Sequence, residues 1–273
     1  MEQISLFDDL TRSNREDDIA IVKKSKSKKN TPTQKGGSLS SKLKFIRDFV
    51  EQYLGKYRDR YLCIRDMETL HTYIDGLIAD YRMSLDTETT GLNVFKDKIV
   101  GISMNSKNNK PAYIPINHVV YGVATNTFSL AENQLTIEQI RPEFERLAKA
   151  IKEVDMFNAV FDRRVFRHNL GIDFPCTFDT SIGAHILNEL KSPKWYKLKT
   201  VHSEWCLNGK EDEFSFGEIF NDIGFDKVPI DIAYLYACRD SEITTELSDF
   251  EREYIYYDPS QDFSARNGMN GAS

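Results

Sequence analysis

The stretch from Ser84 to Leu92 (SLDTETTGL) constrains the fold of this chain more than any other. The apolar segment from Tyr81 to Leu85 predicts a buried strand with Asp86 and Glu88 at its far end, before Thr-Thr-Gly breaks it. Residues two apart in a strand point to the same side, so the two carboxylates project together. Because unpaired carboxylates are costly to bury, we expect both outside the packed interior. Such a pair can hold a divalent cation, although a solvated strand end would look similar.

The segments around this strand predict an α/β domain with a mixed β-sheet flanked by helices. Helical spacing of apolar residues predicts helices over 41–58, 66–79, 136–152 and 230 to about 257, with another opening at 178–180. Further strands are predicted over 61–64, 98–104, 111–118 and 154–157, and a loop over 121–133. The boundaries indicate an edge helix at 41–58 followed by one domain over 59–258, with a polar tail at 259–273.

Composition excludes several classes of protein. No apolar run approaches the roughly 20 residues of a membrane span, and no signal peptide is present, so we expect a cytoplasmic protein of a bacterium or a bacteriophage. The four cysteines are scattered without a CxxC pair, which favours neither a zinc site nor a disulfide framework. Eight lysines and no acid lie between Lys23 and Lys44. Because the whole chain has a net charge of −6, the residues outside this segment carry a net charge of −14. That balance argues against a nonspecific DNA coat and is compatible with an enzyme whose metal ions supply local positive charge.

Residues 1–40 read as a disordered basic tail, either a solvated tether or a loose contact for nucleic acid. Near its tip, Gln3, Leu6 and Phe7 resemble the short peptide by which bacterial replication and repair proteins dock on the DNA sliding clamp. In such a peptide two apolar anchors enter a pocket and glutamine fixes the register. A flexible tether raises the local concentration of the docked domain. A fortuitous tail sequence is the alternative.

Two further acids stand at predicted helix starts. Asn158 is a plausible N-cap for a helix that Gly171 stops, and Asp162 would lie on its first turn, able to project over the strand end. Asp162 could equally be a simple acid that favours the helix dipole. We expect Asp179 to cap the next helix.

The last two segments combine charged and aromatic side chains. Residues 191–199 interleave them, and Lys194 and Lys197 could contact the phosphates of a nucleic-acid strand, although a solvated helix start is an alternative. Tyr236 and Asp240 are four apart, so the phenol and the acid share one face of the final helix. A half-buried tyrosine beside a surface aspartate would show the same spacing.

Three motifs, in order, resemble the DEDD superfamily of 3′–5′ exonucleases: Asp86-Thr-Glu88, Asn158-x-x-x-Asp162 and Tyr236-x-x-x-Asp240. The resemblance is closest to the proofreading domain of family A DNA polymerases, through Asp-Thr-Glu-Thr-x-x-Leu, Ala-Tyr-Ile-Pro-Ile and Phe-Asp-Thr, and it covers residues 61 to about 257. It implies an RNase H-like fold. Tyrosine at 236 marks the DEDDy subgroup, since the histidine subgroup would have His at 235, where this chain has Leu235.

The resemblance also implies roles for matching residues. Four carboxylates are expected to bind two Mg²⁺ or Mn²⁺ ions about 4 Å apart: Asp86, Glu88, Asp162 and Asp240. Such a cluster repels itself and is stable mainly when it binds cations or protons. Tyr236 is expected to orient the attacking water while staying protonated, Leu92 to act as an apolar wedge beside the terminal base, and Asn158 to contact the strand.

These inferences predict a metal-dependent 3′–5′ exonuclease that releases nucleoside 5′-monophosphates from single-stranded or frayed DNA ends. Proofreading is the expected role. The chain has no room for a polymerase, so it is expected to act alone or with a polymerase domain encoded separately. An RNase D-type RNA exonuclease is one alternative, and a noncatalytic module that binds DNA or the clamp is another.

Overall fold

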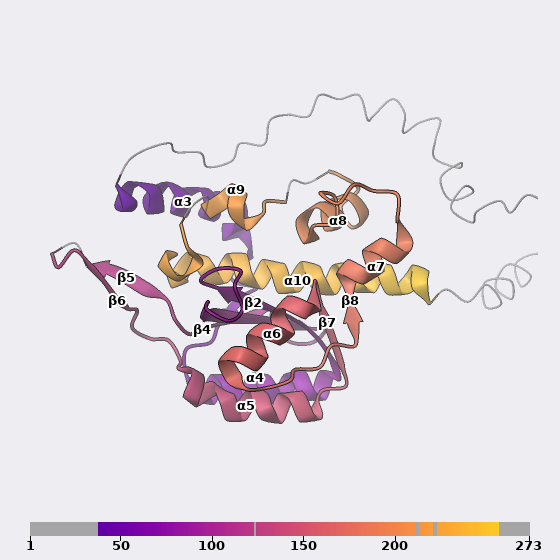
Figure 1. The fold of residues 1–273 in the computed structure, drawn as a ribbon, viewed down its shortest axis with the longest axis horizontal. Helices are drawn as coiled ribbons and strands as arrows, with labels where there is room; N and C mark the ends of the chain where they lie inside the picture. The colour runs from indigo at the N-terminus through magenta and orange to yellow at the C-terminus, as the bar shows by residue number, and fades with distance from the viewer. Residues whose placement is uncertain (1–37, 123, 211–212, 221–222, 257–273) are drawn as a thin grey trace, which may run out of the picture. The chain divides into compact units, whose positions relative to one another are not determined.

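The computed structural model describes residues 38–122, 124–210, 213–220 and 223–256 (Figure 1). The predicted clamp-binding residues Gln3, Leu6 and Phe7 lie outside the described residues, as do nearly all of the predicted basic tail and the whole polar tail. Their predictions stay untested.

A six-stranded mixed sheet lies at the centre of the described part, in the order β1-β4-β3-β2-β7-β8 (Figure 1). The strands are β1 (Leu62–Cys63), β2 (Arg82–Thr89), β3 (Ile99–Ser106), β4 (Ala112–Pro115), β7 (Glu153–Met156) and β8 (Phe178–Asp179). β2 pairs antiparallel with β3 and parallel with β7, so the acid-bearing strand is central. The predicted α/β fold class with a mixed sheet is confirmed.

Helices cover both faces of this sheet. α4 (Met67–Asp80), α5 (Ile137–Ala150) and α6 (Ala159–Leu170) belong to one side, and the long α10 (Ile230–Ile255) crosses the other (Figure 1). Beyond α10 lie α3 (Leu39–Leu54), the 3₁₀ turn η1 (Gly55–Tyr57), α8 (Leu198–Trp205) and α9 (Phe216–Phe220), while α7 (Thr180–Leu187) packs along its C-terminal half. A second 3₁₀ turn, η2 (Phe225–Lys227), precedes α10. Among the described helices, none is both long and apolar enough to cross a membrane.

The alternation of side chains along β2 decides which face holds the acids. Met83 and Leu85 are buried in the core beneath α4 and α5. Ser84, which lies between them, points to the opposite face, since successive side chains alternate across a strand. Ser84 donates a hydrogen bond of 2.6 Å to the carbonyl oxygen of Ser241 on α10. Asp86, two residues beyond Ser84, therefore faces α10.

Two local predictions were wrong. The segment expected to be a loop contains a two-stranded antiparallel hairpin, β5 (Val119–Gly122) and β6 (Thr127–Leu130), whose turn uses Asn126 in the left-handed region. β6 alternates polar and apolar residues (Thr127, Phe128, Ser129, Leu130), so a strand signal was present in the sequence, although all four residues are exposed in the structure. The predicted strand over 111–118 is also shorter, because β4 ends at Pro115.

Glu251 on α10 is a buried carboxyl group for which the described residues supply no hydrogen-bond partner. It lies against Gly183 of α7, where an added Cβ atom would be 2.1 Å from Oε2, so a larger residue would force the pair apart. Burial, with the charges of Asp179 and Asp155, raises the pKa of Glu251 to about 9. A glutamate in the unfolded chain titrates near 4.3. Its contribution to stability is therefore complete below about pH 4.3 and is lost as the pH rises through 9.

We expect Glu251→Gln, which stays neutral at every pH, to gain stability relative to the wild type as the pH rises from 5 to 9. The gain should be at least about 1 kcal/mol, because one unit of pKa shift corresponds to about 1.4 kcal/mol. Urea unfolding followed by circular dichroism at pH 5, 7 and 9 measures it. The exposed Glu253→Gln is the matched control. Parallel pH profiles for all three proteins would contradict the burial of an ionisable Glu251.

Candidate active site

The first and third motifs meet between β2 and α10. One carboxylate oxygen from each of Asp86, Glu88 and Asp240 lies within 4.8 Å of the others. The hydrogen bond from Ser84 to Ser241, next to these acids in sequence, ties the strand to the helix. Residues more than 150 positions apart therefore form one cluster of oxygen ligands.

Asp162 of the second motif joins the cluster through β2. The backbone N–H and the hydroxyl of Thr87 donate hydrogen bonds of 3.0 and 2.6 Å to its Oδ1 atom. Both bonds are made to Oδ1, and together they fix α6 against β2. Asp162 is outside the 4.8 Å group, yet after burial its charge has the largest effect in raising the pKa of Asp86.

Burial and mutual repulsion raise the proton affinity of these acids. Burial, followed by the neighbouring carboxylates, raises the pKa values of Asp86 and Glu88 well above their usual range. Burial raises the pKa of Asp162 to about 7, against the opposing hydrogen bonds from Thr87. Burial also raises the pKa of Asp240, although Lys199 opposes the shift. Four acids arranged in this way favour any cation or proton that relieves their repulsion.

One expectation about the acid pair needs correction. β2 does not end at the acids but continues to Thr89, and both side chains are half-buried. The Oε1 atom of Glu88 is fully buried and has no hydrogen-bond partner among the described residues. An orphaned carboxylate oxygen beside other carboxylates is the donor set that Mg²⁺ or Mn²⁺ prefers, so the site fits such ions. When bound there, divalent ions would acidify a water molecule and stabilise a leaving oxygen.

Tyr236 lies beside the acids with its hydroxyl hydrogen-bonded to Asp240. The residue is 4% exposed, and its ring packs against Phe220 and Phe225 at centroid distances of 5.3 and 6.1 Å. Burial raises the pKa of Tyr236 well above 10, so it remains a hydrogen-bond donor at neutral pH. Leu235, at the position of the histidine subgroup, is fully buried in the core.

Lys199 lies at the site but is not among the residues predicted for it from the sequence. Its Nζ atom forms an ion pair with Oδ1 of Asp240 and lies 5.0 Å from the centroid of the Tyr236 ring. The side chain is only 8% exposed, although the lysine stands on the first turn of α8 in a stretch that looks solvated. No pattern in the sequence marks this burial, which only the packing of Lys199, Val201 and His202 on one face of α8 reveals.

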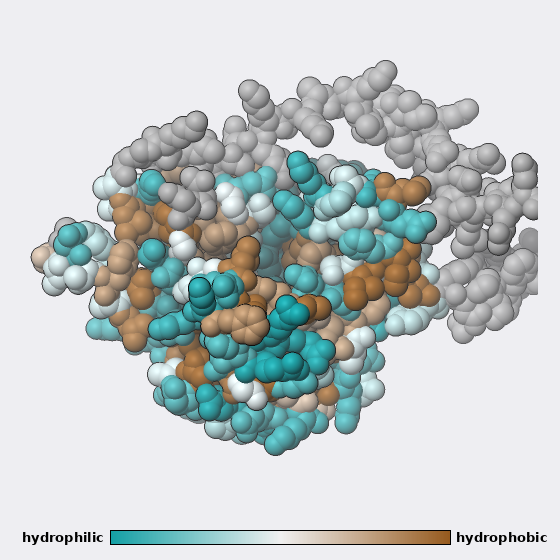
Figure 2. All heavy atoms as spheres, viewed as in Figure 1, coloured by the Kyte–Doolittle hydropathy of each residue, from teal (hydrophilic) through white to brown (hydrophobic). Residues whose placement is uncertain are grey.

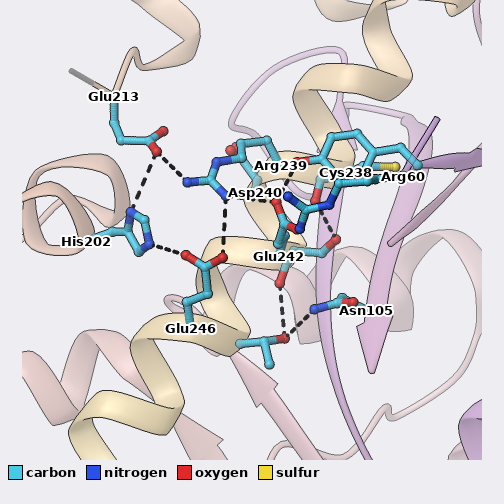
Figure 3. Close-up of polar contacts among 12 residues, drawn as sticks. Arg60, Asn105, His202, Glu213, Cys238, Arg239, Asp240, Glu242 and Glu246 are labelled. Carbon is cyan, nitrogen blue, oxygen red and sulfur yellow. Dashed lines mark hydrogen bonds and ion pairs between the residues drawn. The ribbon is translucent and has the colours of Figure 1, made fainter. Parts of the chain in front are cut away.

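A largely buried ionic network adjoins this lysine, whose Nζ atom lies 3.9 Å from Oε2 of Glu213. Figure 3 shows the part of the network around Arg239. Arg239 lies between Glu213 and Glu242, with N–O distances of 2.7 and 2.8 Å, and approaches Glu246 at 3.5 Å. His202 contacts Glu246 at 2.6 Å. Because Arg239 precedes Asp240 on α10, the network fixes the turn of helix that presents Asp240 to the carboxylate cluster.

Lys199→Met is expected to lower the rate of strand shortening 10- to 100-fold, the usual cost of removing a group that orients a metal ligand. Without the cation, Asp240 takes up a proton more readily, so the acidic limb of the pH–rate profile should move to higher pH. Initial rates at saturating Mg²⁺ between pH 6 and 9 measure both effects. The exposed Lys149→Met on α5 serves as the control. Wild-type rates and an unmoved pH profile in a folded Lys199→Met protein would contradict this role.

Asp179 keeps its predicted capping role and also takes over the one predicted for Asn158. Asn158 occupies the N-cap position of α6 in the left-handed conformation, with φ of 65°, but its side chain makes no capping hydrogen bond. Asp179 instead accepts hydrogen bonds from the backbone N–H groups of Asn158, Ala159 and Ser181. One carboxylate therefore caps α7 as predicted and α6 as well, which leaves the exposed Asn158 side chain available.

The other predicted strand-binding residues lie on the surface. Leu92 follows β2 and is 87% exposed. Lys194 and Lys197 are exposed before α8, where Lys197 occupies the N-cap position. Exposure alone does not test a contact with DNA, so the contacts expected from Leu92, Lys194 and Lys197 stay predictions.

Comparison with known proteins decides the family. Residues 61–251 match a family of DNA polymerase A exonuclease domains described as 3′–5′ exonuclease. The chain belongs to this family. The enzyme is therefore a 3′–5′ exonuclease of DEDD type, a class that uses two divalent metal ions, and the predicted family and cofactors are confirmed.

Two curated relatives of this exonuclease are DNA polymerases. DNA polymerase I of Borreliella burgdorferi is 25% identical over 195 residues, which cover 69% of this chain, and that of Rhizobium leguminosarum is 25% identical over 207 residues, 68% of the chain. The exonuclease spans about a fifth of their length (19% of each). A solved structure of Brucella melitensis NrnC with bound Mg²⁺ is 16% identical, with a TM-score of 0.47 over 71% of this chain and 78% of that one.

Proposed function

We propose that this exonuclease trims the 3′ ends of single-stranded or frayed DNA and serves as a proofreading activity in DNA replication. The convergence of Asp86, Glu88 and Asp240 beside Tyr236 carries the proposal, because it supplies both the metal ligands and a hydroxyl donor. DNA is the proposed substrate because the two curated relatives compared above are DNA polymerases.

The proposed site residues act together on the terminal phosphodiester. Asp86, Glu88, Asp162 and Asp240 hold the metal ions, and Tyr236 hydrogen-bonds the attacking water. The exposed Leu92 side chain contacts the last base and Asn158 the strand next to it. Lys194 and Lys197 contact phosphates through charge, and such contacts carry no direct information about the base sequence.

The proposed partners are a polymerase and the sliding clamp. The polymerase domain belongs to a separate chain or to further residues of a longer protein. Gln3, Leu6 and Phe7 dock on the clamp, with the basic segment as a tether. Deleting residues 1–8 should abolish capture of this protein by immobilised clamp without changing the shortening of a free oligonucleotide. Undiminished capture of the deleted protein would contradict the docking role.

A 5′-labelled primer with a mismatched 3′ end, and an RNA strand of the same sequence, test the substrate. We expect stepwise shortening of the DNA primer in Mg²⁺, no shortening in EDTA, and at least tenfold slower shortening of RNA. Faster shortening of RNA would indicate an RNase D-type activity. A protein that shortens neither strand in Mg²⁺ would be a noncatalytic binding module.

A further inference from the structure

A half-open pocket of about 430 Å³ lies between α6 and α7, outside the cluster of carboxylates. Among the residues that line it are Val160, Arg163, Arg164, Arg167, Phe178 and Ile182. On the face shown in Figure 2, hydrophilic side chains over α6 adjoin a hydrophobic patch over α7. We call this feature the α6–α7 pocket.

The apolar wall of the pocket is open to solvent. Val160 and Ile182 are 57% and 58% exposed, and Ile186, one helical turn beyond Ile182, is 65% exposed. Three such residues side by side on two helices form an apolar surface of the kind that marks interaction sites.

The opposite wall is cationic. Arg163 donates to the carbonyl oxygen of Phe174 and, like Arg167, pairs with Asp173, at 2.8 and 2.9 Å. One carboxylate therefore serves two guanidinium groups. Arg164 is exposed, and no ion pair joins it to another described residue. Three guanidinium groups therefore face two carboxylates, those of Asp173 and Asp179, and the pocket keeps a net positive charge that can bind phosphate.

The pocket and the active site share α6. A helix turns about 100° per residue, so Arg163, Arg164 and Arg167 lie roughly 100–200° around the axis from Asp162. Asp179 lines the pocket and also holds the backbone of Asn158 at the start of the same helix. The arginines thus lie on the side of α6 away from Asp162, and a strand whose 3′ end reaches Asp162 would enter the pocket by passing over the first turn of α6.

We propose that the α6–α7 pocket binds the single strand several nucleotides upstream of the 3′ end that is cleaved. Guanidinium groups recognise the phosphates, and the apolar wall contacts sugars and bases. This inference rests on the proposed function, since it needs a nucleic-acid substrate at the carboxylates. The guanidinium groups and the shared helix favour a strand over an acidic peptide, the other ligand that such a surface could take.

The test compares Arg164→Glu/Arg167→Glu with the wild-type surface. Arg163 is left in place because it holds the backbone at Phe174. Binding of fluorescent 12-mers and trimers, in both DNA and RNA, is measured by anisotropy in Mg²⁺ with Asp86→Asn present throughout to stop cleavage. The matched control is Arg141→Glu, an exposed arginine on α5, on a different helix from the pocket.

We expect the double substitution to weaken binding of the 12-mer about tenfold and of the trimer less than twofold, because a trimer at the active site cannot reach the pocket. The slope of log affinity against log salt should fall by about 1.4 for two lost phosphate contacts. Arg141→Glu should change neither. Equal weakening of both lengths, or 12-mer binding equal to that of the control, would overturn the proposal. Unchanged strand binding with loss of binding to an acidic, apolar peptide would assign the pocket to a protein partner instead. Because DNA and RNA are both tested for binding, a wrong choice of substrate in the proposed function would show separately.

Discussion

Asp86→Asn is expected to lower the rate of strand shortening by at least about 1,000-fold while leaving the protein folded. Asp86 is central to the site, since Glu88, Asp162 and Asp240 all act on its pKa. Metal ions contribute several kcal/mol of transition-state stabilisation, and about 4 kcal/mol corresponds to a factor of 1,000. Single-turnover assays with a labelled primer measure the loss.

The same substitution should raise the thermal midpoint of the metal-free protein. Asn is nearly isosteric with Asp and removes one of four mutually repelling acids, and each kcal/mol of relief corresponds to about 2–4 °C in a domain of this size. Mg²⁺ should then stabilise the wild type, by about 2.7 kcal/mol at 100 times its dissociation constant, and stabilise the variant far less. An Asp86→Asn protein that is inactive and also less stable without metal would indicate a structural role for Asp86 in place of a metal-binding one.

Arg239→Met is expected to cause the largest loss of stability of any single change in the ionic network. Arg239 is 4% exposed and pairs with the buried Glu213 and Glu242. Removing one partner of a buried network leaves uncompensated charge and costs about 3–5 kcal/mol. At about 2–4 °C per kcal/mol, the thermal midpoint should fall by roughly 6–20 °C.

Arg60→Met is the matched control for this prediction, because Arg60 pairs with Glu242 from a side chain that is 59% exposed. A pair exposed on one side contributes about 1 kcal/mol or less. Thermal unfolding of both variants at pH 7 gives the comparison. Equal midpoints would show that burial does not strengthen the dependence on Arg239.

The sequence predicted the parts of the site that follow from local periodicity. Alternation along β2 placed Asp86 and Glu88 on one side, and helical spacing placed Tyr236 and Asp240 on one face. The partner of Asp240 could not be predicted, because Lys199 sits in a charged stretch and only the packing of α8 buries it.

Two other features escaped the sequence for a similar reason. The alternation of polar and apolar residues in β6 spans only four positions, all of them exposed, within a polar stretch. Asp179 caps α6 from 20 residues away, a tertiary hydrogen bond that takes the place of the local cap expected from Asn158. In the hairpin the pattern is short and exposed, and in the cap of α6 the deciding hydrogen bond joins segments that are separated in the chain, which periodicity does not report.

Crystals grown with Mn²⁺ and a nucleoside 5′-monophosphate would test the central claim most directly, through anomalous scattering at the manganese edge. We predict anomalous peaks in contact with carboxylate oxygens of Asp86, Glu88, Asp162 and Asp240, and their loss in Asp86→Asn. Manganese bound elsewhere, with these four carboxylates unligated in crystals of active protein, would contradict the assignment of the active site.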